Sequence, residues 1–444
     1  MNTFTDIGRA LLLGVTLLTL PIAQSQAKQV TLSVDPATPV MSAGESQSAF
    51  IKISLQGPKT IATQQRNVTN VALVLDKSGS MSGSKIANAR EAAAMAIDQL
   101  SEQDIVSVIT YDSQVRVIVP ATRVSNRSSI RRAIANIGAS GNTALFAGVT
   151  RGASELRKFL SRNQINRVVL LSDGLANVGP STPHELGELG LSLSREGISV
   201  TTIGLGLGYN EDLMTRLAGF SDGNHAFVEN EADLAKIFRF EFGDLTSVVA
   251  KDVEIRIRCL NGVQPLRILG RHGEINGDLV TTRMSQLYSE QEKYVILEVE
   301  VPANSDGQQL DLADIQLSYN DLGTQQQLST SSIASVRFTE SKKEVESNLD
   351  TQAYESAVEQ VANELSREAV ELRDKGQLED ARKVLQSSAN YLSEKAAALA
   401  SPKLQQFSEE AEADADEVAD DAEWTRKRKE LKERQYKRAT QQSY

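Results

Sequence analysis

The amino-acid sequence predicts an α/β protein. A doubly wound, mostly parallel sheet is expected to be inserted in, or flanked by, an antiparallel β-sandwich, with a helical hairpin after them. Between about residues 70 and 242, short apolar segments rich in β-branched residues alternate with segments of helical period, as in a sheet covered by helices on both faces. The segments on either side are short, alternating and bounded by turn residues, which is typical of a sandwich. After about residue 341, apolar residues recur at intervals of three and four, the spacing of a helix.

The α/β region is assigned to residues 70–242. Its predicted strands are Val71–Leu75, Ile105–Tyr111, Val115–Val119, Arg167–Ser172, Val200–Leu205 and His225–Phe227. Helical patterns fill the gaps, at Lys85–Leu100, Ser128–Ile137, Leu145–Leu160, Pro183–Glu196, Glu211–Ala218 and Ala232–Phe242. Only Asp112–Gln114 separates the second strand from the third, and this is too short for a crossover. These two strands are therefore expected to form an antiparallel hairpin at one edge of the sheet.

The sandwich is assigned to residues 28–69 and 243–340, on the two sides of the α/β region. Its predicted strands are Val30–Val34, Ala49–Leu55, Val253–Ile257, Tyr294–Val301, Ile315–Tyr319 and Ile333–Phe338. Because some of these strands precede the α/β region and most follow it, the simplest arrangement inserts that region into the sandwich. The closely spaced termini of compact domains make such an insertion easy.

The C-terminal part is expected to be helical at first and then highly charged. Residues 341–400 are predicted to form a helical hairpin, with Gly376 as the cap between a first helix and a second at Leu378–Leu399. Residues 401–444 hold an acidic run, Glu409–Glu423, and a basic run, Arg426–Arg438. Such blocks are usually solvated helix or disorder, so the segment is expected to be one of these. A docking tail and pairing of the two blocks with each other are the functional alternatives.

The first residues have the features of an export signal. Arg9 precedes the apolar run Ala10–Leu20, Pro21 follows it, and Ser25–Ala27 offers small residues for cleavage, so residues 1–27 are expected to be a signal peptide. The alternative is an uncleaved membrane anchor, although the run is shorter than the roughly 20 apolar residues that span a bilayer. No later segment is long and apolar enough to span one. We therefore expect an exported protein, periplasmic or secreted, and the single cysteine rules out an internal disulfide.

A candidate cation site follows the first strand of the α/β region. Asp76, Ser78 and Ser80 place three oxygen side chains at alternate positions directly after the buried strand Val71–Leu75. Ligands in open α/β sheets bind beyond the carboxyl ends of the strands, where these residues lie. Carboxylates and hydroxyls suit Mg²⁺, Mn²⁺ or Ca²⁺ and suit zinc or copper poorly. The alternative is an ordinary turn in which Asp76 only caps the next helix.

Two further residues are expected to reach the same place. Thr143 lies in a loop between two predicted helices, and Asp173 follows the apolar run Val168–Leu171 as Asp76 follows its own strand. Neighbouring parallel strands are about 4.8 Å apart, so both carboxylates can reach one ion directly or through water.

This set of residues resembles the metal-ion-dependent adhesion site of von Willebrand factor type A (VWA) domains, and Ile203–Gly206 resembles a later strand and turn of that family. The resemblance implies a Rossmann-like fold whose divalent cation is held by Ser78, Ser80 and Thr143, with Asp76 and Asp173 binding directly or through water. It also implies one coordination position for an acidic group of a partner. The overall arrangement resembles exported bacterial VWA proteins, the heavy chains of inter-alpha-trypsin inhibitor and calcium-activated chloride-channel-like proteins.

Other kinds of chemistry find less support in the sequence. The net charge of -11 argues against a general nucleic-acid binder, and His184, His225 and His272, the only histidines, do not make a histidine-based metal or catalytic site. A phosphoryl-transferring enzyme of the haloacid-dehalogenase type needs a carboxylate where this chain has Ser78. The glycines of residues 204–208 lack the third glycine of a dinucleotide-binding motif, and Cys259 is expected to be packed rather than nucleophilic.

Two functions therefore remain from the sequence. The favoured one is an exported, metal-dependent binding module, not an enzyme, whose partner is a protein with an exposed Asp or Glu. The alternative is an assembly or scaffold factor that acts through its C-terminal helices and charged tail, with a metal site that mainly stabilises the domain. The sequence leaves the choice of ion and the oligomeric state open.

Overall fold

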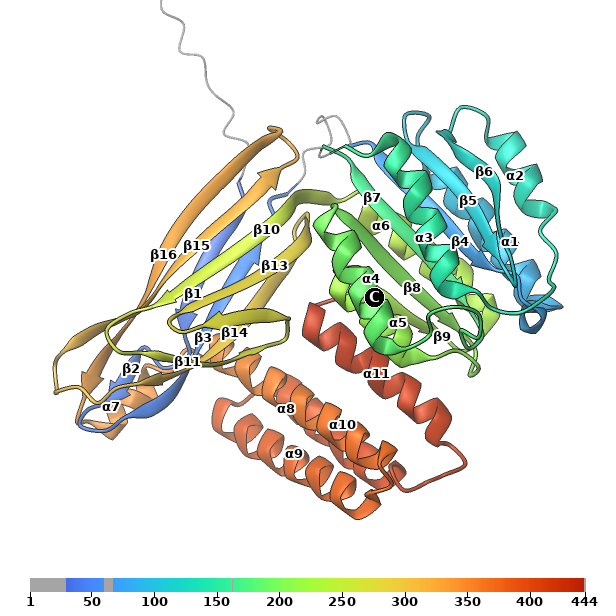
Figure 1. Ribbon diagram of the computed structural model, residues 1–444. Helices are drawn as coiled ribbons and strands as arrows, with labels where there is room; N and C mark the ends of the chain where they lie inside the picture. Colours follow the sequence, from blue (N-terminus) through green and yellow to red (C-terminus); the bar gives the residue numbers. More distant parts are fainter. Residues whose placement is uncertain (1–28, 60–66, 162, 443–444) are drawn as a thin grey trace, which may run out of the picture.

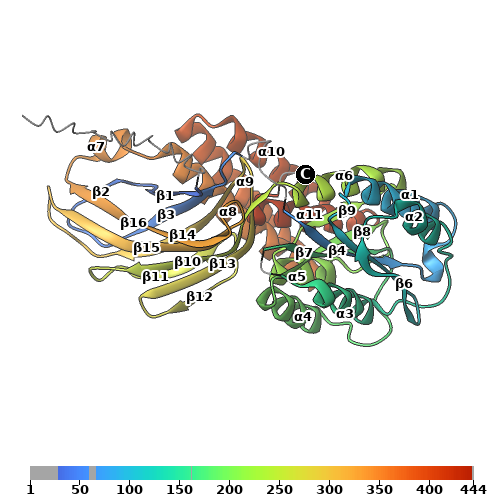
Figure 2. The same ribbon diagram turned by 90° about the horizontal axis from the view of Figure 1, so that it is seen from above.

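The computed structural model describes residues 29–59, 67–161 and 163–442. The expected signal peptide lies outside the described residues. Figures 1 and 2 show a β-sandwich and an α/β domain side by side, with helices from the C-terminal part of the chain packed against both. None of the helices in the described ranges is long and apolar enough to cross a membrane.

The sheet of the α/β domain has the order β6-β5-β4-β7-β8-β9. Its strands are β4 (Thr69–Asp76), β5 (Ile105–Tyr111), β6 (Val115–Arg123), β7 (Ile165–Ser172), β8 (Ile198–Leu205) and β9 (His225–Val228). All neighbours are parallel except β5 and β6, which form the predicted antiparallel hairpin at one edge. Every residue of β4 and β7 is buried, because helices cover both faces of these central strands. The predicted fold class is confirmed.

Six α-helices cover the two faces of this sheet. They are α1 (Ser84–Gln99), α2 (Arg127–Ala135), α3 (Leu145–Leu156), α4 (Pro183–Arg195), α5 (Glu211–Ser221) and α6 (Leu234–Leu245). Helices α1, α2 and α6 share one apolar core with the sheet, whereas α3, α4 and α5 share the other. This double coverage leaves the loops at the carboxyl ends of the strands as the open edge of the domain.

The sandwich is built from segments on both sides of the α/β domain. One sheet has the order β1-β3-β14-β11, with β1 (Thr31–Pro36), β3 (Gln47–Gln56), β14 (Glu292–Val301) and β11 (Gln264–Leu269). The other has the order β12-β13-β10-β15-β16-β2, with β12 (Gly273–Asn276), β13 (Leu279–Tyr288), β10 (Val248–Cys259), β15 (Gln309–Asp321), β16 (Gln326–Thr339) and β2 (Val40–Ser42). Early strands thus pair with late ones, and one apolar core fills the space between the sheets.

The sequence did not predict β2, β11, β12 and β13. The residues of β12 are exposed throughout, and β13 reads LVTTRMSQLY, where polar residues occupy the solvent side and the junction with the α/β domain. Strand β10 begins five residues before its predicted start, at Val248 rather than Val253. The strand is interrupted at Asp252, which has φ 51° beside a register shift, and this hides the early part of the pattern.

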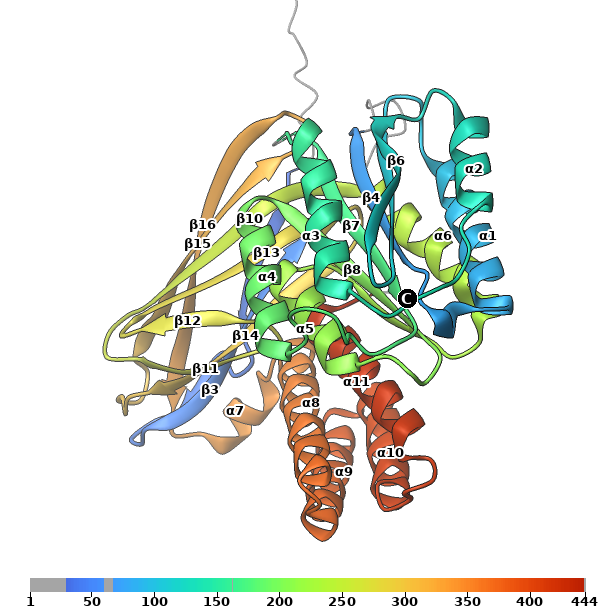
Figure 3. The ribbon, with the colours of Figure 1, turned by 45° about the vertical axis from the view of Figure 1, so that its right-hand side comes forward.

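The C-terminal part holds the helices α7 (Lys342–Ser347), α8 (Thr351–Asp374), α9 (Leu378–Leu399), α10 (Pro402–Glu417) and α11 (Trp424–Thr440). Helices α8 and α9 form the expected hairpin, and Gly376 takes the left-handed conformation between them with φ 79°. The charged segment is helical. Figure 3 shows that α10 stays with the hairpin and that α11 lies along the α/β domain.

The acidic and basic runs of this segment pair with each other. The Lys427 ammonium lies 2.9 Å from Asp414 and 2.6 Å from Glu417, and Arg438 pairs with Glu410. Pairing of the two blocks, one of the alternatives left by the sequence, is therefore what the structure contains. Arg428 and Lys432 of α11 instead pair with acidic residues at the start of α5 in the α/β domain.

Helix α11 covers the free edge of β9. The amide of Phe227 donates to Glu433 at 3.0 Å, and Gln442 both accepts from and donates to the backbone of His225 at 3.1 Å. Lys429 is 2% exposed and donates to the Tyr209 carbonyl at 2.7 Å while it pairs with Glu211. An edge strand that would otherwise present unpaired backbone groups is thus closed by side chains of the last helix.

A candidate metal centre at the carboxyl edge of the sheet

The turn after β4 is organised by the Asp76 carboxylate. Asp76 is completely buried, and its Oδ1 accepts the Ser78 amide at 2.8 Å while its Oδ2 accepts the Ser172 hydroxyl at 2.8 Å. A short 3₁₀ turn, Gly79–Met81, follows and buries the Met81 side chain against the core. This turn directs the hydroxyls of Ser78 and Ser80 to the same side, 3.0 Å apart.

The second carboxylate comes from the neighbouring strand. Asp173 follows β7, is 1% exposed and accepts the Ser80 hydroxyl on Oδ1 at 2.7 Å. Its Oδ2 pairs with the Lys85 ammonium at 2.6 Å, from the first turn of α1. Ser80 therefore links the turn after β4 directly to the end of β7.

Thr143 is brought to the same place by a loop that is bonded to this turn. The Gly79 amide donates to the Gly141 carbonyl at 2.9 Å, and the Ser140 amide donates to the Lys77 carbonyl at 2.6 Å. On its other side the Thr143 amide donates to the Asn177 side chain at 2.9 Å. These bonds fix a loop that has no regular structure of its own.

Gly174 marks the centre of the site. A Cβ atom placed on Gly174 would lie 3.3 Å from Oγ1 of Thr143 and 3.4 Å from Oγ of Ser80. The two hydroxyls therefore border the space that the missing side chain leaves open. The structure brings together all the residues that the sequence singled out: Asp76, Ser78, Ser80, Thr143 and Asp173.

The donor set fits a hard divalent cation. It consists of two carboxylates and three hydroxyls, all oxygen ligands. No cluster of three or more His, Cys, Asp or Glu side chains that could hold a metal occurs among the residues the structure describes. The five residues of the candidate site include no nitrogen or sulfur ligand of the kind that zinc prefers.

Electrostatics also favour a cation at this site. Burial raises the pKa of the Asp76 carboxyl, the negative charge of Asp173 adds to the rise, and hydrogen bonds from Ser78 and Ser172 oppose it. The Tyr111 phenol beneath the site donates to the Leu171 carbonyl at 3.0 Å, and burial together with the charge of Asp76 raises its pKa well above the usual range. A positive ion would relieve the repulsion between the two carboxylates.

Several residues that shape the site were not predicted. Ser172 holds Asp76, Lys85 holds Asp173 and Asn177 holds the Thr143 loop. Ser172 and Asn177 lie within four residues of Asp173, so a search of the polar neighbours of that strand end would have found them. Nothing in the spacing of the sequence marks Lys85, whose partner is 88 residues away.

The other reactive side chains do not form a second centre. His184 is exposed, His225 is buried against Thr202, and His272 stacks on the Phe220 ring with centroids 4.6 Å apart. Cys259 is buried, and burial raises the pKa of its thiol to about 11, so it is packed as expected.

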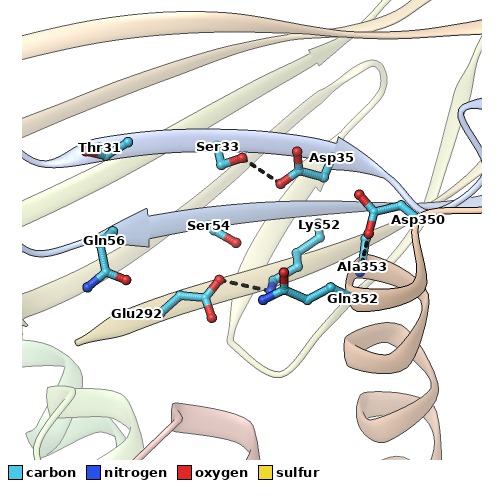
Figure 4. Close-up of a pocket in the computed structure, with 10 residues that line it drawn as sticks. All are labelled: Thr31, Ser33, Asp35, Lys52, Ser54, Gln56, Glu292, Asp350, Gln352 and Ala353. Carbon is cyan, nitrogen blue, oxygen red and sulfur yellow. Dashed lines mark hydrogen bonds and ion pairs between the residues drawn. The ribbon is translucent and has the colours of Figure 1, made fainter. Parts of the chain in front are cut away.

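A polar pocket of about 270 Å³ lies outside the α/β domain, between the sandwich strands β1, β3 and β14 and the start of α8 (Figure 4). Its charged groups already have partners. Lys52 pairs with Glu292 at 2.9 Å, Asp35 accepts from Ser33 at 2.6 Å, and Asp350 caps α8. We therefore do not assign a ligand to this pocket.

Comparison with known families agrees with the fold and with the sequence resemblance. Residues 70–240 match the family model of the von Willebrand factor type A domain. This part of the chain is a VWA domain. The candidate metal centre described above lies at the end of this VWA domain where β4 and β7 finish.

Three curated relatives share the VWA domain. The uncharacterized protein YfbK of Escherichia coli K12 is 27% identical over 48% of this chain and 37% of its own length. Uncharacterized protein sll0103 of Synechocystis is 27% identical over 57% of this chain and 61% of its own. Inter-alpha-trypsin inhibitor heavy chain H3 of Rattus norvegicus is 27% identical over 42% of this chain and 22% of its own. The chain thus matches only part of each of these proteins.

Two solved structures share most of the architecture. A von Willebrand factor type A protein from Catenulispora acidiphila covers 84% of this chain and 88% of its own, with a TM-score of 0.68 and 18% identity. The ArnB paralog VWA2 from Sulfolobus acidocaldarius covers 93% and 98%, with a TM-score of 0.63 and 16% identity. At these identities the likeness concerns the fold, and it extends well beyond the VWA domain.

Proposed function

We propose that this protein is an adhesion-type binding module, which captures an acidic side chain of a partner protein through a divalent cation held by Asp76, Ser78, Ser80, Thr143 and Asp173. The observation that carries the proposal is that these two carboxylates and three hydroxyls come together: Asp76 holds Ser78, Ser80 bonds Ser78 and Asp173, and the Thr143 hydroxyl lies beside that of Ser80 at Gly174. VWA domains are commonly metal-dependent protein-interaction modules, which supports the same reading.

The charge balance of the site explains why a bound cation would still attract an acid. Two carboxylates neutralise a divalent ion, while the three hydroxyls add no charge. The ion would therefore keep affinity for one more anionic oxygen, which the partner supplies. The donor set suits Mg²⁺, Mn²⁺ or Ca²⁺, and nothing in this chemistry requires a catalytic step.

The first experiment measures cation binding itself. Titration of the protein with Mg²⁺, Mn²⁺ and Ca²⁺ in a calorimeter is expected to show one site, and Asp76→Ala is expected to weaken it by about 100-fold or more, since even outer partners of a ligand contribute 10- to 100-fold. Asp98→Ala is the matched control, because Asp98 lies 45% exposed on α1 and pairs only with Arg131. Equal binding by both variants would contradict the proposed ligand set.

The second experiment measures partner chemistry. Immobilised peptides containing a single Asp or Glu are expected to bind the protein in the presence of the cation, and binding should disappear on chelation, in Asp76→Ala, and when the acid is replaced by Asn or Gln. Retention of binding by the amide peptides would show that the acidic group is not the feature captured.

Export remains part of the proposal. We infer a periplasmic or secreted protein from Arg9, Ala10–Leu20 and the small residues ending at Ala27. Fractionation of cells, with sequencing of the mature N-terminus, tests it: a protein that begins at Lys28 outside the cytoplasm is expected, and a cytoplasmic chain that begins at Met1 would contradict it.

The scaffold alternative has weaker support from the structure. It requires the charged tail to be free for partners, whereas the basic residues of α11 pair with acidic residues of α10 and of the VWA domain. Deletion of residues 341–444 is therefore expected to expose the β9 edge and the sandwich rather than to remove a partner site.

A further inference from the structure

Two exposed leucines flank the candidate metal centre. Leu175 is 59% exposed and Leu207 is 45% exposed. Single exposed apolar residues are common on protein surfaces and need no function. These two differ from Leu266 or Ile333 of the sandwich. Leu175 lies two residues after Asp173, one of the proposed cation ligands, and Leu207 precedes Gly208, which packs against the Asp173 carbonyl.

Leu207 is held in place from both sides. Gly206 takes φ 69°, donates its amide to the Val228 carbonyl at 2.8 Å and lies beside the Lys85 ammonium. Gly208 lies so close to Asp173 that a Cβ atom on it would be 2.7 Å from the Asp173 carbonyl oxygen. The loop therefore packs directly on the site, and its one large side chain is directed away from the core.

Leu175 is held in a similar way. It follows Gly174, whose missing side chain borders the hydroxyls of Thr143 and Ser80. Two residues later, Asn177 exchanges hydrogen bonds with Thr143, since its amide donates to the Thr143 carbonyl at 3.1 Å and its side chain accepts the Thr143 amide at 2.9 Å. Ala176 packs on the core between these anchors. The fixed backbone leaves Leu175 in solvent.

Neither loop could bury its leucine without breaking contacts that build the metal centre. Movement of the Leu207 loop would separate Gly208 from Asp173, and movement of the Leu175 loop would release Asn177 from Thr143. The two side chains are therefore presented beside the centre at fixed positions. Lys85, whose side chain is 31% exposed, adds a positive charge at the same rim.

We propose that Leu175 and Leu207 form an apolar rim that selects protein segments in which the captured acidic residue has an apolar neighbour one or two positions away. The rim rests on the proposed function, because the acid is taken to bind the cation. The cation and Lys85 fit the carboxylate, and the leucines fit the neighbouring apolar side chain, so affinity and specificity come from adjacent groups.

The test uses two immobilised peptides that share one aspartate. One carries leucines one and two positions from the aspartate, and the other carries serines there. The full chain, loaded with Mg²⁺, Mn²⁺ or Ca²⁺, is expected to bind the leucine peptide about tenfold more tightly, the effect of burying roughly one leucine.

Substitutions of the two leucines test whether the rim causes this preference for the leucine peptide. Leu175→Ser and Leu207→Ser are each expected to lower the preference several-fold, and the double variant to abolish it. Leu266→Ser is the matched control, because Leu266 is 48% exposed on β11 of the sandwich. It should bind both peptides as the parent protein does.

The outcomes separate the rim from the proposed function. Cation-dependent binding of both peptides with equal affinity would overturn the rim alone. A leucine preference that persists in Asp76→Ala or after chelation would also overturn it, since the leucines would then act as a patch independent of the centre. Absence of cation-dependent binding by either peptide would overturn the proposed function and the rim with it.

Discussion

A buried charge lies near each end of strand β7, and the two charges have different surroundings. Near its start, the Arg167 guanidinium is completely buried and donates to Ser199 at 3.0 Å, Tyr288 at 2.8 Å, Glu241 and Gln286. Just past its other end, Asp173 is bonded by Ser80 and Lys85 at the open edge of the domain. One strand thus links a closed ionic junction to a candidate binding site.

The difference lies in the groups that surround each charge. The partners of Arg167 come from β8, α6 and the sandwich strand β13, so the junction joins the VWA domain to the sandwich. At the opposite edge, the Ser80 hydroxyl bonds both Ser78 and Asp173, and the Thr143 and Ser80 hydroxyls border the position of the side chain that Gly174 lacks. Arg167 is paired with a carboxylate of opposite charge and joins two parts of the protein, which is a structural role. Two neighbouring carboxylates grouped with three hydroxyls instead form an oxygen set that suits a cation.

The largest effect is expected from breaking the closed junction. Arg167→Met leaves the Glu241 carboxylate buried without its ion-pair partner, and such changes destabilise by about 3–5 kcal/mol. Urea denaturation should show this loss in the free energy of unfolding. The control Arg256→Met removes an ion pair of a 59% exposed arginine and should change stability by less than about 1 kcal/mol. Equal effects of the two variants would contradict the distinction.

A second prediction concerns acid stability at the edge that α11 covers. His225 is completely buried between Thr202, Tyr209 and Tyr436, and burial, together with the charges of Lys437 and Lys429, lowers the pKa of its imidazole to about 3. The unfolded chain, with an ordinary histidine pKa, binds more protons between pH 3 and 6.5, so stability falls as pH decreases through that window.

His225→Gln isolates this contribution. Between pH 7 and pH 4 the parent protein is expected to lose about 3 kcal/mol more unfolding free energy than the variant. Asp244 acts in the opposite direction, since burial raises the pKa of its carboxyl to about 6, but it is present in both proteins and cancels. Urea denaturation at the two pH values measures the difference, and parallel pH profiles would disprove the assignment to His225.

The third prediction concerns the docking of α11. Lys429→Met removes the bonds to Tyr209 and Glu211 and the contact of the ammonium with the Tyr209 ring, 4.3 Å from its centroid. Because Arg428 still pairs with Glu211, the expected loss is about 2 kcal/mol, less than for Arg167. Limited proteolysis should cut α11 faster in this variant. Lys383→Met, at a 71% exposed lysine of α9, should be cut at the same rate as the parent protein. Equal rates for the two variants would argue against the role of Lys429 in docking α11.

The same comparison explains what the sequence could and could not predict. Asp76, Ser78 and Ser80 are neighbours in the chain, and Asp173 ends a parallel strand, so local pattern and sheet geometry suffice to bring them together. The Arg167 junction and the α11 contacts include hydrogen bonds between residues that are far apart in the sequence. Arg167 and Gln286 are 119 residues apart, and Gln442 and His225 are 217 residues apart. The spacing of apolar residues along the chain does not predict such long-range pairs.

Strand β13 shows that long-range contacts also limit the prediction of the fold from the sequence. Gln286 and Tyr288 accept hydrogen bonds from the Arg167 guanidinium across the junction, which explains their polar character. These polar residues interrupt the alternation of apolar and polar residues by which a sandwich strand is recognised. The sequence therefore predicts the layers whose faces meet solvent or an apolar core. In β13 it misses a strand whose pattern is set in part by another domain.

The smallest change tests the open site directly. Gly174→Ala adds one carbon that would lie 3.3 Å from Thr143 Oγ1 and 3.4 Å from Ser80 Oγ. The first distance is tighter than ordinary contact, so the Thr143 hydroxyl must shift by a few tenths of an ångström. We expect cation affinity to fall about tenfold by calorimetry, with unfolding free energy in the absence of cation changed by less than about 0.5 kcal/mol. Gly138→Ala is the control, because a Cβ there meets nothing within 4 Å. If Gly174→Ala destabilised the domain and left cation binding intact, the space beside Gly174 would be ordinary packing, and the contrast between the two ends of β7 would fail.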